Sequence, residues 1–199
     1  TAAAFASRGA EVFILDRDLP AAQSVASRIG GVGLKCYVTR ASSVERAFAH
    51  ICRSLGGLDI LVSNAGAAWQ GRIGEVDEKT LRDSFELNFW GHQRCAQAAV
   101  SIMKAQGTGG VLLFNTSKQA INPGPSFGPY GLPKASTLFL SRQYALDHGA
   151  DGIRSNSVNA DRVRTGLLTE DMIKTRSELR GISEEDYLAG NLLGREVTA

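Results

Sequence analysis

The chain has 199 residues, of which 43% are hydrophobic and 21% are charged, and its formal net charge is +2. This composition excludes a disordered chain and is typical of one soluble domain with a sizeable core, so we expect a single domain over residues 1–199. The charges form no basic block, which argues against nucleic acid or an anionic membrane as a partner and favours a small molecule.

Short apolar or β-branched runs alternate with longer helical patterns along the whole chain. Strands are predicted at 11–16, 34–38, 58–63, 111–115 and 153–159, and helices near 1–9, 21–29, 43–55, 77–104 and 134–148. This alternation is the signature of a parallel sheet covered by helices on both faces. The predicted fold class is therefore α/β, a Rossmann-like doubly wound parallel sheet without repeats or linkers.

One element of such a sheet is missing from the sequence. No strand and no glycine-rich turn precede the first predicted helix, and Gly30, Gly31 and Gly33 precede a strand, whereas a phosphate-binding loop follows one. In the doubly wound order 3-2-1-4-5-6 the first strand lies at the centre. We therefore expect an internal fragment that lacks its first and last strands and binds NAD weakly, because the pyrophosphate site at the first helix N-terminus is missing.

Tyr130 and Lys134 are the residues with the most informative spacing. Four residues apart, they lie on the same face of a predicted helix, whose start Pro129 and Pro133 place close to Tyr130. An ammonium about 4 Å from a phenol favours the phenolate by roughly 4 kcal/mol, or about 3 pKa units, so Tyr130 is expected to titrate near neutral pH. The same spacing alone also fits a solvated surface pair.

Polar motifs occur in a defined order along the chain: Asn64-Ala65-Gly66 after one apolar run, Asn88 in a helical stretch, Ser117 after another apolar run, and Tyr130 with Lys134 thirteen residues later. Together they resemble the short-chain dehydrogenase/reductase family. The resemblance implies that Ser117 polarises the substrate oxygen and Tyr130 exchanges the proton, while Lys134 shifts the pKa of the tyrosine and holds the nicotinamide ribose. Hydride then moves directly between the substrate carbon and the cofactor.

The resemblance also assigns a role to Asn88, which would distort its helix and hold a water in a proton relay. The alternative is a core asparagine with satisfied hydrogen bonds. Asn64, Ala65 and Gly66 would form the turn that packs beside the adenosine, or else a plain strand-to-loop turn. Thr165 matches the threonine that binds the nicotinamide carboxamide.

Asp16 bears on the choice of cofactor. An acidic side chain at the end of this strand accepts hydrogen bonds from the adenosine ribose and repels a 2′-phosphate, which favours NAD over NADP. Arg17 partly offsets that repulsion, and the alternative role for Asp16 is a turn or helix N-cap. Tyr37 and Ala160-Asp161 depart from the family pattern and put the adenine contacts in doubt, so a catalytically impaired dinucleotide-binding or structural module is the competing hypothesis.

Residues 115–119, 129–134 and 190–199 resemble, more narrowly, the dehydrogenase half of bifunctional class II aldolase/short-chain dehydrogenase proteins. This implies an NAD-dependent oxidoreductase of carbohydrate metabolism, acting on a small hydroxyl or carbonyl compound such as lactaldehyde and preceded by an aldolase domain. Family members usually associate through the helices placed here at 77–104 and 134–148, so a homo-oligomer is expected.

The remaining reactive side chains indicate no metal. Cys36, Cys52 and Cys95 are odd in number and widely spaced, which argues against disulfides and favours a reducing, cytoplasmic compartment. No apolar stretch approaches the roughly 18 residues of a membrane span. The three histidines make no ligand pattern with a cysteine and are predicted to be non-catalytic: His50, His92 and His148.

Overall fold

The computed structural model describes residues 1–165 and 168–198. Gly166, Leu167 and Ala199 lie outside the described residues, so the predicted domain over 1–199 is described without them. The chain forms two compact units, residues 1–158 and 159–199, which are treated separately below.

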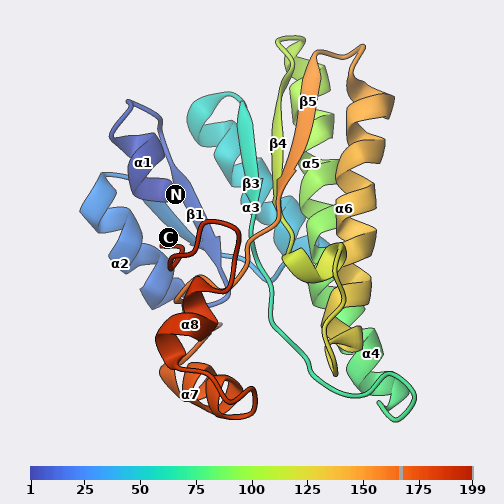
Figure 1. Ribbon diagram of the computed structural model, residues 1–199. Helices are drawn as coiled ribbons and strands as arrows, with labels where there is room; N and C mark the ends of the chain where they lie inside the picture. Colours follow the sequence, from blue (N-terminus) through green and yellow to red (C-terminus); the bar gives the residue numbers. More distant parts are fainter. Residues whose placement is uncertain (166–167, 199) are drawn as a thin grey trace. The chain divides into compact units, whose positions relative to one another are not determined.

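The first unit contains five parallel strands in two sheets (Figure 1). In one sheet β1 (Phe13–Asp16) pairs with β2 (Val32–Lys35). In the other, β4 (Gly110–Asn115) lies between β3 (Ile60–Ser63) and β5 (Ile153–Val158). The α/β Rossmann-like class is confirmed, and each predicted strand overlaps an observed one. The strand predicted at 34–38 is shifted: β2 begins at Val32, so Gly33 lies within the strand rather than before it.

Helices connect these strands, as expected for parallel neighbours. Their bounds are α1 Ala2–Ala6, α2 Leu19–Ile29, α3 Ala41–Leu55, α4 Glu78–Phe85, α5 Gly91–Gln106 and α6 Gly128–His148, with a π-helical turn η1 at Glu86–Trp90 and a 3-10 turn η2 at Lys118–Ala120. The one helix predicted over 77–104 is thus interrupted by η1. Pro133 lies inside α6 rather than in its first turn, because the helix begins at Gly128, earlier than predicted.

Local sequence explains where several helices begin and end. Asp18 and Asp77 cap α2 and α4, accepting hydrogen bonds from the main-chain N–H groups of Ala21 and Thr80. The C-terminal ends of α3 and α5 are followed by Gly56 and Gly107 in the left-handed region, where glycine carries no steric cost.

The core of the first unit joins α3 and α5 to β4. Phe48 from α3, Ala96 and Met103 from α5, and Leu112 and Phe114 from β4 are all buried in one apolar cluster. Burial of side chains of this size stabilises the fold by about 1.5–3 kcal/mol each, so this cluster fixes α5 against the carboxyl half of the strands.

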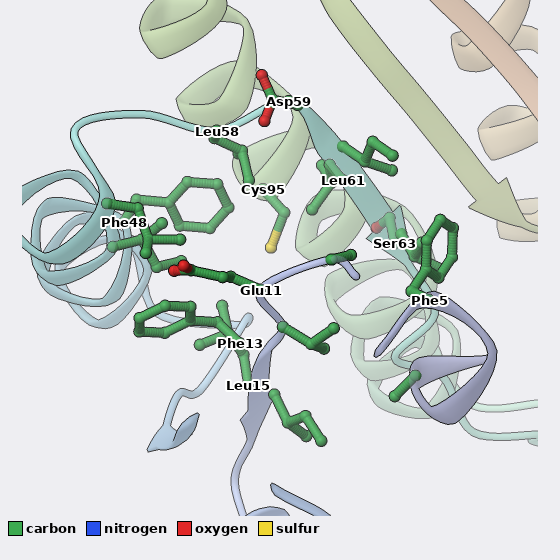
Figure 2. Close-up of a pocket in the computed structure, with 18 of the residues that line it drawn as sticks. Phe5, Glu11, Phe13, Leu15, Phe48, Leu58, Asp59, Leu61, Ser63 and Cys95 are labelled. Atoms are coloured by element: carbon green, nitrogen blue, oxygen red, sulfur yellow. The ribbon is translucent and has the colours of Figure 1, made fainter. Parts of the chain in front are cut away.

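A cavity of about 1200 Å³ separates the two sheets. Its walls include Glu11–Asp16 on one side and Leu58–Ala65 on the other, so it runs along the whole length of β1 and β3. Figure 2 shows side chains from α3, β3 and α5 around it, among them Phe48, Leu61 and Cys95. Among the described residues no strand lies between β1 and β3.

The second unit holds two short helices, α7 (Glu170–Glu178) and α8 (Glu184–Ala189). Leu168, Ile173, Tyr187 and Leu188 form its small buried core. The guanidinium groups of Arg162 and Arg180 lie 4.8 and 4.9 Å from the centroid of the Tyr187 ring. Cation–π contacts of this kind help to hold so small a unit together.

Within the described residues, every helix is too short or too polar to cross a membrane. The same residues contain no group of three or more His, Cys, Asp and Glu side chains suited to a metal ion.

Candidate active site

Four of the predicted catalytic side chains are buried in the first unit. Ser117 follows the end of β4, Asn88 lies in η1, and Tyr130 and Lys134 occupy the first two turns of α6. Tyr130 is 7% exposed, Lys134 3% and Asn88 0%. A solvated surface pair, the alternative for the Tyr130 and Lys134 spacing, is therefore excluded.

Ser117 and Tyr130 are brought into direct contact. Their side chains are hydrogen-bonded to each other. Ser117 Oγ also accepts from the main-chain N–H of Gln119 at 3.2 Å, because Ser117 caps η2. The twelve residues between the serine and the tyrosine thus return the phenol to the end of β4.

The predicted pKa of Tyr130 is wrong in direction. Burial raises the pKa of the phenol above its ordinary value, and the hydrogen bond with Ser117 offsets the rise only in part. Lys134 Nζ lies 5.8 Å from the centroid of the Tyr130 ring. Desolvation therefore outweighs the charge of the lysine, and the resting tyrosine is protonated at neutral pH.

Lys134 is held by uncharged groups. Its Nζ donates to the main-chain oxygen of Asn115 at 2.9 Å and lies 3.5 Å from His92 Nε2. Burial lowers the pKa of Lys134 to about 8, so most of the ammonium is still charged at pH 7.

Asn88 has a full set of hydrogen bonds. Its Nδ2 donates to the main-chain oxygen of Ala67 at 2.8 Å and to Ser84 Oγ at 3.1 Å, and its Oδ1 accepts from Ala67 N at 3.2 Å. Thr137 Oγ1 donates to the main-chain oxygen of Asn88 at 2.7 Å. The predicted helix distortion is confirmed as the π-helical turn, and Asn88 ties the segment after β3 to α4 and α6. The water relay stays a prediction.

The turn at Asn64, Ala65 and Gly66 is tightly packed. A Cβ atom on Gly66 would lie 2.9 Å from Asn88 Oδ1 and 3.3 Å from Lys134 Nζ. The absence of a side chain at Gly66 is therefore what allows the asparagine and the lysine to approach the chain here. Contact with adenosine stays a prediction.

Asp16 ends β1 with an exposed side chain. Its Oδ1 accepts from Asp18 N at 2.9 Å, so Asp16 shapes the turn, and the helix cap is Asp18. Nearby, Tyr37 carries the Arg40 guanidinium 4.8 Å from its ring centroid. Binding of ribose by Asp16 stays a prediction.

Thr165 belongs to the second unit, where it forms an isolated bridge with Leu168. The structure does not place the second unit relative to the first, so the role of Thr165 at the nicotinamide stays a prediction.

Sequence reasoning missed part of this cluster. His92 is buried beside Lys134 and bonds to the buried Ser63, and the side chain of Asn115 bonds to that of Asn64. Ser63 directly precedes Asn64 and His92 lies one helical turn after Asn88, which is the signal that could have found them.

Comparison with known proteins identifies the family of the chain. Nicotinamide-dependent oxidoreductases are the class that the doubly wound fold and the Ser117, Tyr130 and Lys134 cluster define. A family model described as "Enoyl-(Acyl carrier protein) reductase" matches residues 1–199. The chain belongs to the short-chain dehydrogenase/reductase family.

Individual relatives span different shares of the chain. The "Uncharacterized oxidoreductase YuxG" of Bacillus subtilis is 32% identical over 169 residues, which are 81% of this chain and 24% of that protein. A short-chain type dehydrogenase/reductase from Mycobacterium marinum is 29% identical with a TM-score of 0.87, covering 99% of this chain and 77% of that one. A 3-ketoacyl-(acyl-carrier-protein) reductase from Brucella melitensis complexed with NADH is 25% identical with a TM-score of 0.86, covering 99% and 79%. The chain thus spans about a quarter of the Bacillus relative.

Proposed function

We propose that this chain is the catalytic part of an NAD-dependent oxidoreductase that acts on a small hydroxyl or carbonyl compound, with Tyr130 as the acid/base. The observation that carries the proposal is the buried hydrogen bond between Ser117 and Tyr130, with Lys134 one helical turn away. A serine and a tyrosine that share one hydrogen bond present two hydroxyl groups to a single substrate oxygen.

The protonation state of Tyr130 suits reduction of a carbonyl. When the substrate carbon receives hydride, negative charge develops on its oxygen, and the phenol donates its proton there while Ser117 donates a hydrogen bond. The nicotinamide cofactor supplies the hydride when bound. In the oxidative direction Tyr130 must first lose its proton, and the positive charge on Lys134 favours that loss.

Two features of the chain support a nicotinamide dinucleotide as cofactor. Gly66 has no side chain, so Asn88 and Lys134 approach the main chain of this turn closely. The ammonium of Lys134 has three N–H donors, one of which bonds to the Asn115 oxygen, and a ribose hydroxyl would accept from another. Asp16 is the residue that favours NAD over NADP, because its exposed carboxylate repels a 2′-phosphate. Replacing Asp16 by Ser should therefore raise the rate with NADPH relative to that with NADH.

The substrate class rests on the resemblance to aldolase-linked dehydrogenases. We propose a sugar-derived aldehyde or alcohol such as lactaldehyde, with an aldolase domain in the same protein and a homo-oligomeric assembly. The Bacillus relative, of which the match covers 24%, supports a longer protein.

Replacement of Tyr130 by Phe tests the catalytic role. We expect turnover to fall at least a thousandfold while the fold is retained, because the only atom removed is the phenol oxygen. Tyr144→Phe is the matched control, since Tyr144 is equally buried on α6 but bonds to Gln93 at 2.9 Å. Oxidation of lactaldehyde is followed by NADH absorbance, and equal rates in the Tyr130 variant and the control would reject the role.

A catalytically impaired binding module is the second candidate function. It is favoured by the cavity between β1 and β3 and by Tyr37 at a position where the family pattern has an aspartate. This candidate predicts that the unaltered chain turns over no alcohol or aldehyde from a panel of small substrates. Turnover that disappears with Tyr130→Phe excludes it.

A further inference from the structure

His92 forms a buried chain of contacts between β3 and Lys134. Its ring lies on α5, is 2% exposed and packs against Phe114 with ring centroids 6.2 Å apart. Nδ1 lies 2.7 Å from Ser63 Oγ at the end of β3, and Nε2 lies 3.5 Å from Lys134 Nζ. Both ring nitrogens therefore face a polar partner, although the sequence predicted a non-catalytic histidine.

The chemistry of the partners fixes the protons on this ring. A lysine ammonium has three donors and no acceptor, so Nε2 must offer its lone pair to Lys134. The single ring proton then lies on Nδ1 and is donated to Ser63 Oγ, which selects one tautomer. Burial, together with the charge of Lys134, lowers the pKa of His92 to about 3, so the ring is neutral throughout the working range.

We propose that His92 is a positioning residue for Lys134: Ser63 orients the neutral imidazole, and the imidazole gives the lysine ammonium a second acceptor beside the Asn115 carbonyl. This inference rests on the proposed function, because it concerns the lysine that acts on Tyr130. Two acceptors on different elements, His92 on α5 and Asn115 on β4, restrict the position of Nζ more than one does.

A neutral acceptor has an advantage over a carboxylate at this place. A carboxylate would hold the ammonium more strongly but would offset most of its charge, and the electrostatic effect on Tyr130 would be lost. The titratable groups of the cluster are Tyr130 and Lys134 from α6 and His92 from α5, and the other neighbours, Ser63 and Asn115, carry no charge. The positive charge of Lys134 is thus left uncompensated within the cluster.

Loss of the imidazole should change the pKa of Lys134. Hydrogen bonds to charged groups are stronger than those between neutral groups, and the 3.5 Å separation makes this contact one of the weaker of them. We therefore expect His92→Phe to lower the pKa of Lys134 by about one unit, since about 1.4 kcal/mol corresponds to one unit. His92→Gln, which keeps an acceptor near the position of Nε2, should restore most of the shift.

Nuclear magnetic resonance measures both predictions directly on the whole chain. The ¹⁵N shifts of the His92 ring should show a neutral imidazole protonated on Nδ1, and the ¹³Cε shift of Lys134 should titrate near pH 8 in the unaltered protein. Ser63→Ala should weaken the preference for that tautomer, and it provides a second variant if His92→Phe fails to fold. His50→Phe, at a position on α3 outside the cluster, is the control.

The outcomes separate this inference from the proposed function. A lysine pKa unchanged in His92→Phe, or a ring protonated on Nε2 in the unaltered protein, would overturn the positioning role. A lysine pKa that shifts as expected in a chain without turnover would support the positioning role and reject the catalytic one. If turnover is present, the alkaline limb of its pH–rate profile should shift in His92→Phe and shift back towards its original position in His92→Gln. A purely structural defect would lower the rate by the same factor at all pH values.

Discussion

The side-chain amide of Asn115 donates to the side-chain oxygen of Asn64 over 2.7 Å and thereby joins the carboxyl ends of β4 and β3. The main-chain oxygen of the same Asn115 accepts from Lys134. One residue thus bonds to the predicted cofactor turn through its side chain and to the predicted catalytic lysine through its backbone.

Replacement of Asn115 by Ala separates these two bonds. The bond to Asn64 is lost and the backbone bond to Lys134 stays, so we expect the free energy of unfolding to fall by about 1 kcal/mol while the pKa of Lys134 is unchanged. Urea denaturation and lysine titration measure the two effects. A large shift in the lysine pKa would show that the side chain, too, holds the ammonium.

Gly66→Ala should destabilise the fold. The added Cβ would meet Asn88 Oδ1 at 2.9 Å, and overpacking of this kind typically costs about 1–3 kcal/mol. Gly74→Ala is the matched control, because a Cβ there has no neighbour within 4 Å and the residue has no positive φ. Thermal denaturation of both variants gives the comparison, and equal melting temperatures would contradict the packing described for Gly66.

Lys134→Met should stabilise the fold at neutral pH while abolishing turnover. Because the pKa of Lys134 falls from about 10.5 in the unfolded chain to about 8 in the fold, the unfolded state binds more protons between these values. The sign of the linkage then requires that the stability contributed by this lysine rises with pH over that window. Below pH 8 the free energy of unfolding of the variant should exceed that of the unaltered protein by roughly 3 kcal/mol at most. This difference should shrink towards pH 10.5.

The free energies of unfolding of the variant and the unaltered protein are compared at each pH. Because both proteins contain the same tyrosines, the effect of tyrosine titration on stability cancels in the difference. An exposed lysine serves as control for the substitution itself: Lys104→Met removes a lysine whose ion pair with Asp151 lies on the surface. A stability difference for Lys134→Met that does not depend on pH would contradict the lowered lysine pKa.

The outer face of α6 carries an apolar stripe that fits the expected subunit interface. Leu132, Phe139 and Leu146 recur every seven residues and are 46%, 66% and 80% exposed. Phe139→Arg should convert an oligomer to a monomer, because it places a charge at the centre of the stripe. Light scattering after size exclusion reports the mass, and Leu192→Arg, at a fully exposed leucine of the second unit, is the control. A monomeric unaltered chain would reject the interface.

The sequence was sufficient for those features that depend on local pattern. Alternating apolar runs predicted β1 to β5, and the spacing of Ser117 from Tyr130 predicted two hydroxyl groups that prove to be hydrogen-bonded.

Features that depend on burial and on distant segments were beyond the sequence. The four-residue spacing of Tyr130 and Lys134 gives their proximity but not their desolvation, so the predicted direction of the tyrosine pKa was wrong. His92 lies 29 residues from Ser63 and 42 from Lys134, and only the folded chain brings the three together. Because His92 belongs to no ligand pattern, its spacing in the sequence did not mark it as a site residue.

The gap between β1 and β3 has a consequence for the cooperativity of the first unit. Main-chain hydrogen bonds link strands within each sheet, but among the described residues none links β1 to β3, so the two sheets are coupled through side-chain packing such as that of α3 on α5. The main-chain hydrogen bonds of one sheet can therefore open without breaking those of the other sheet. Amide protons of β1 and β2 should exchange with solvent through local openings that leave β4 protected. The two sheets of the first unit should then open separately and differ in stability.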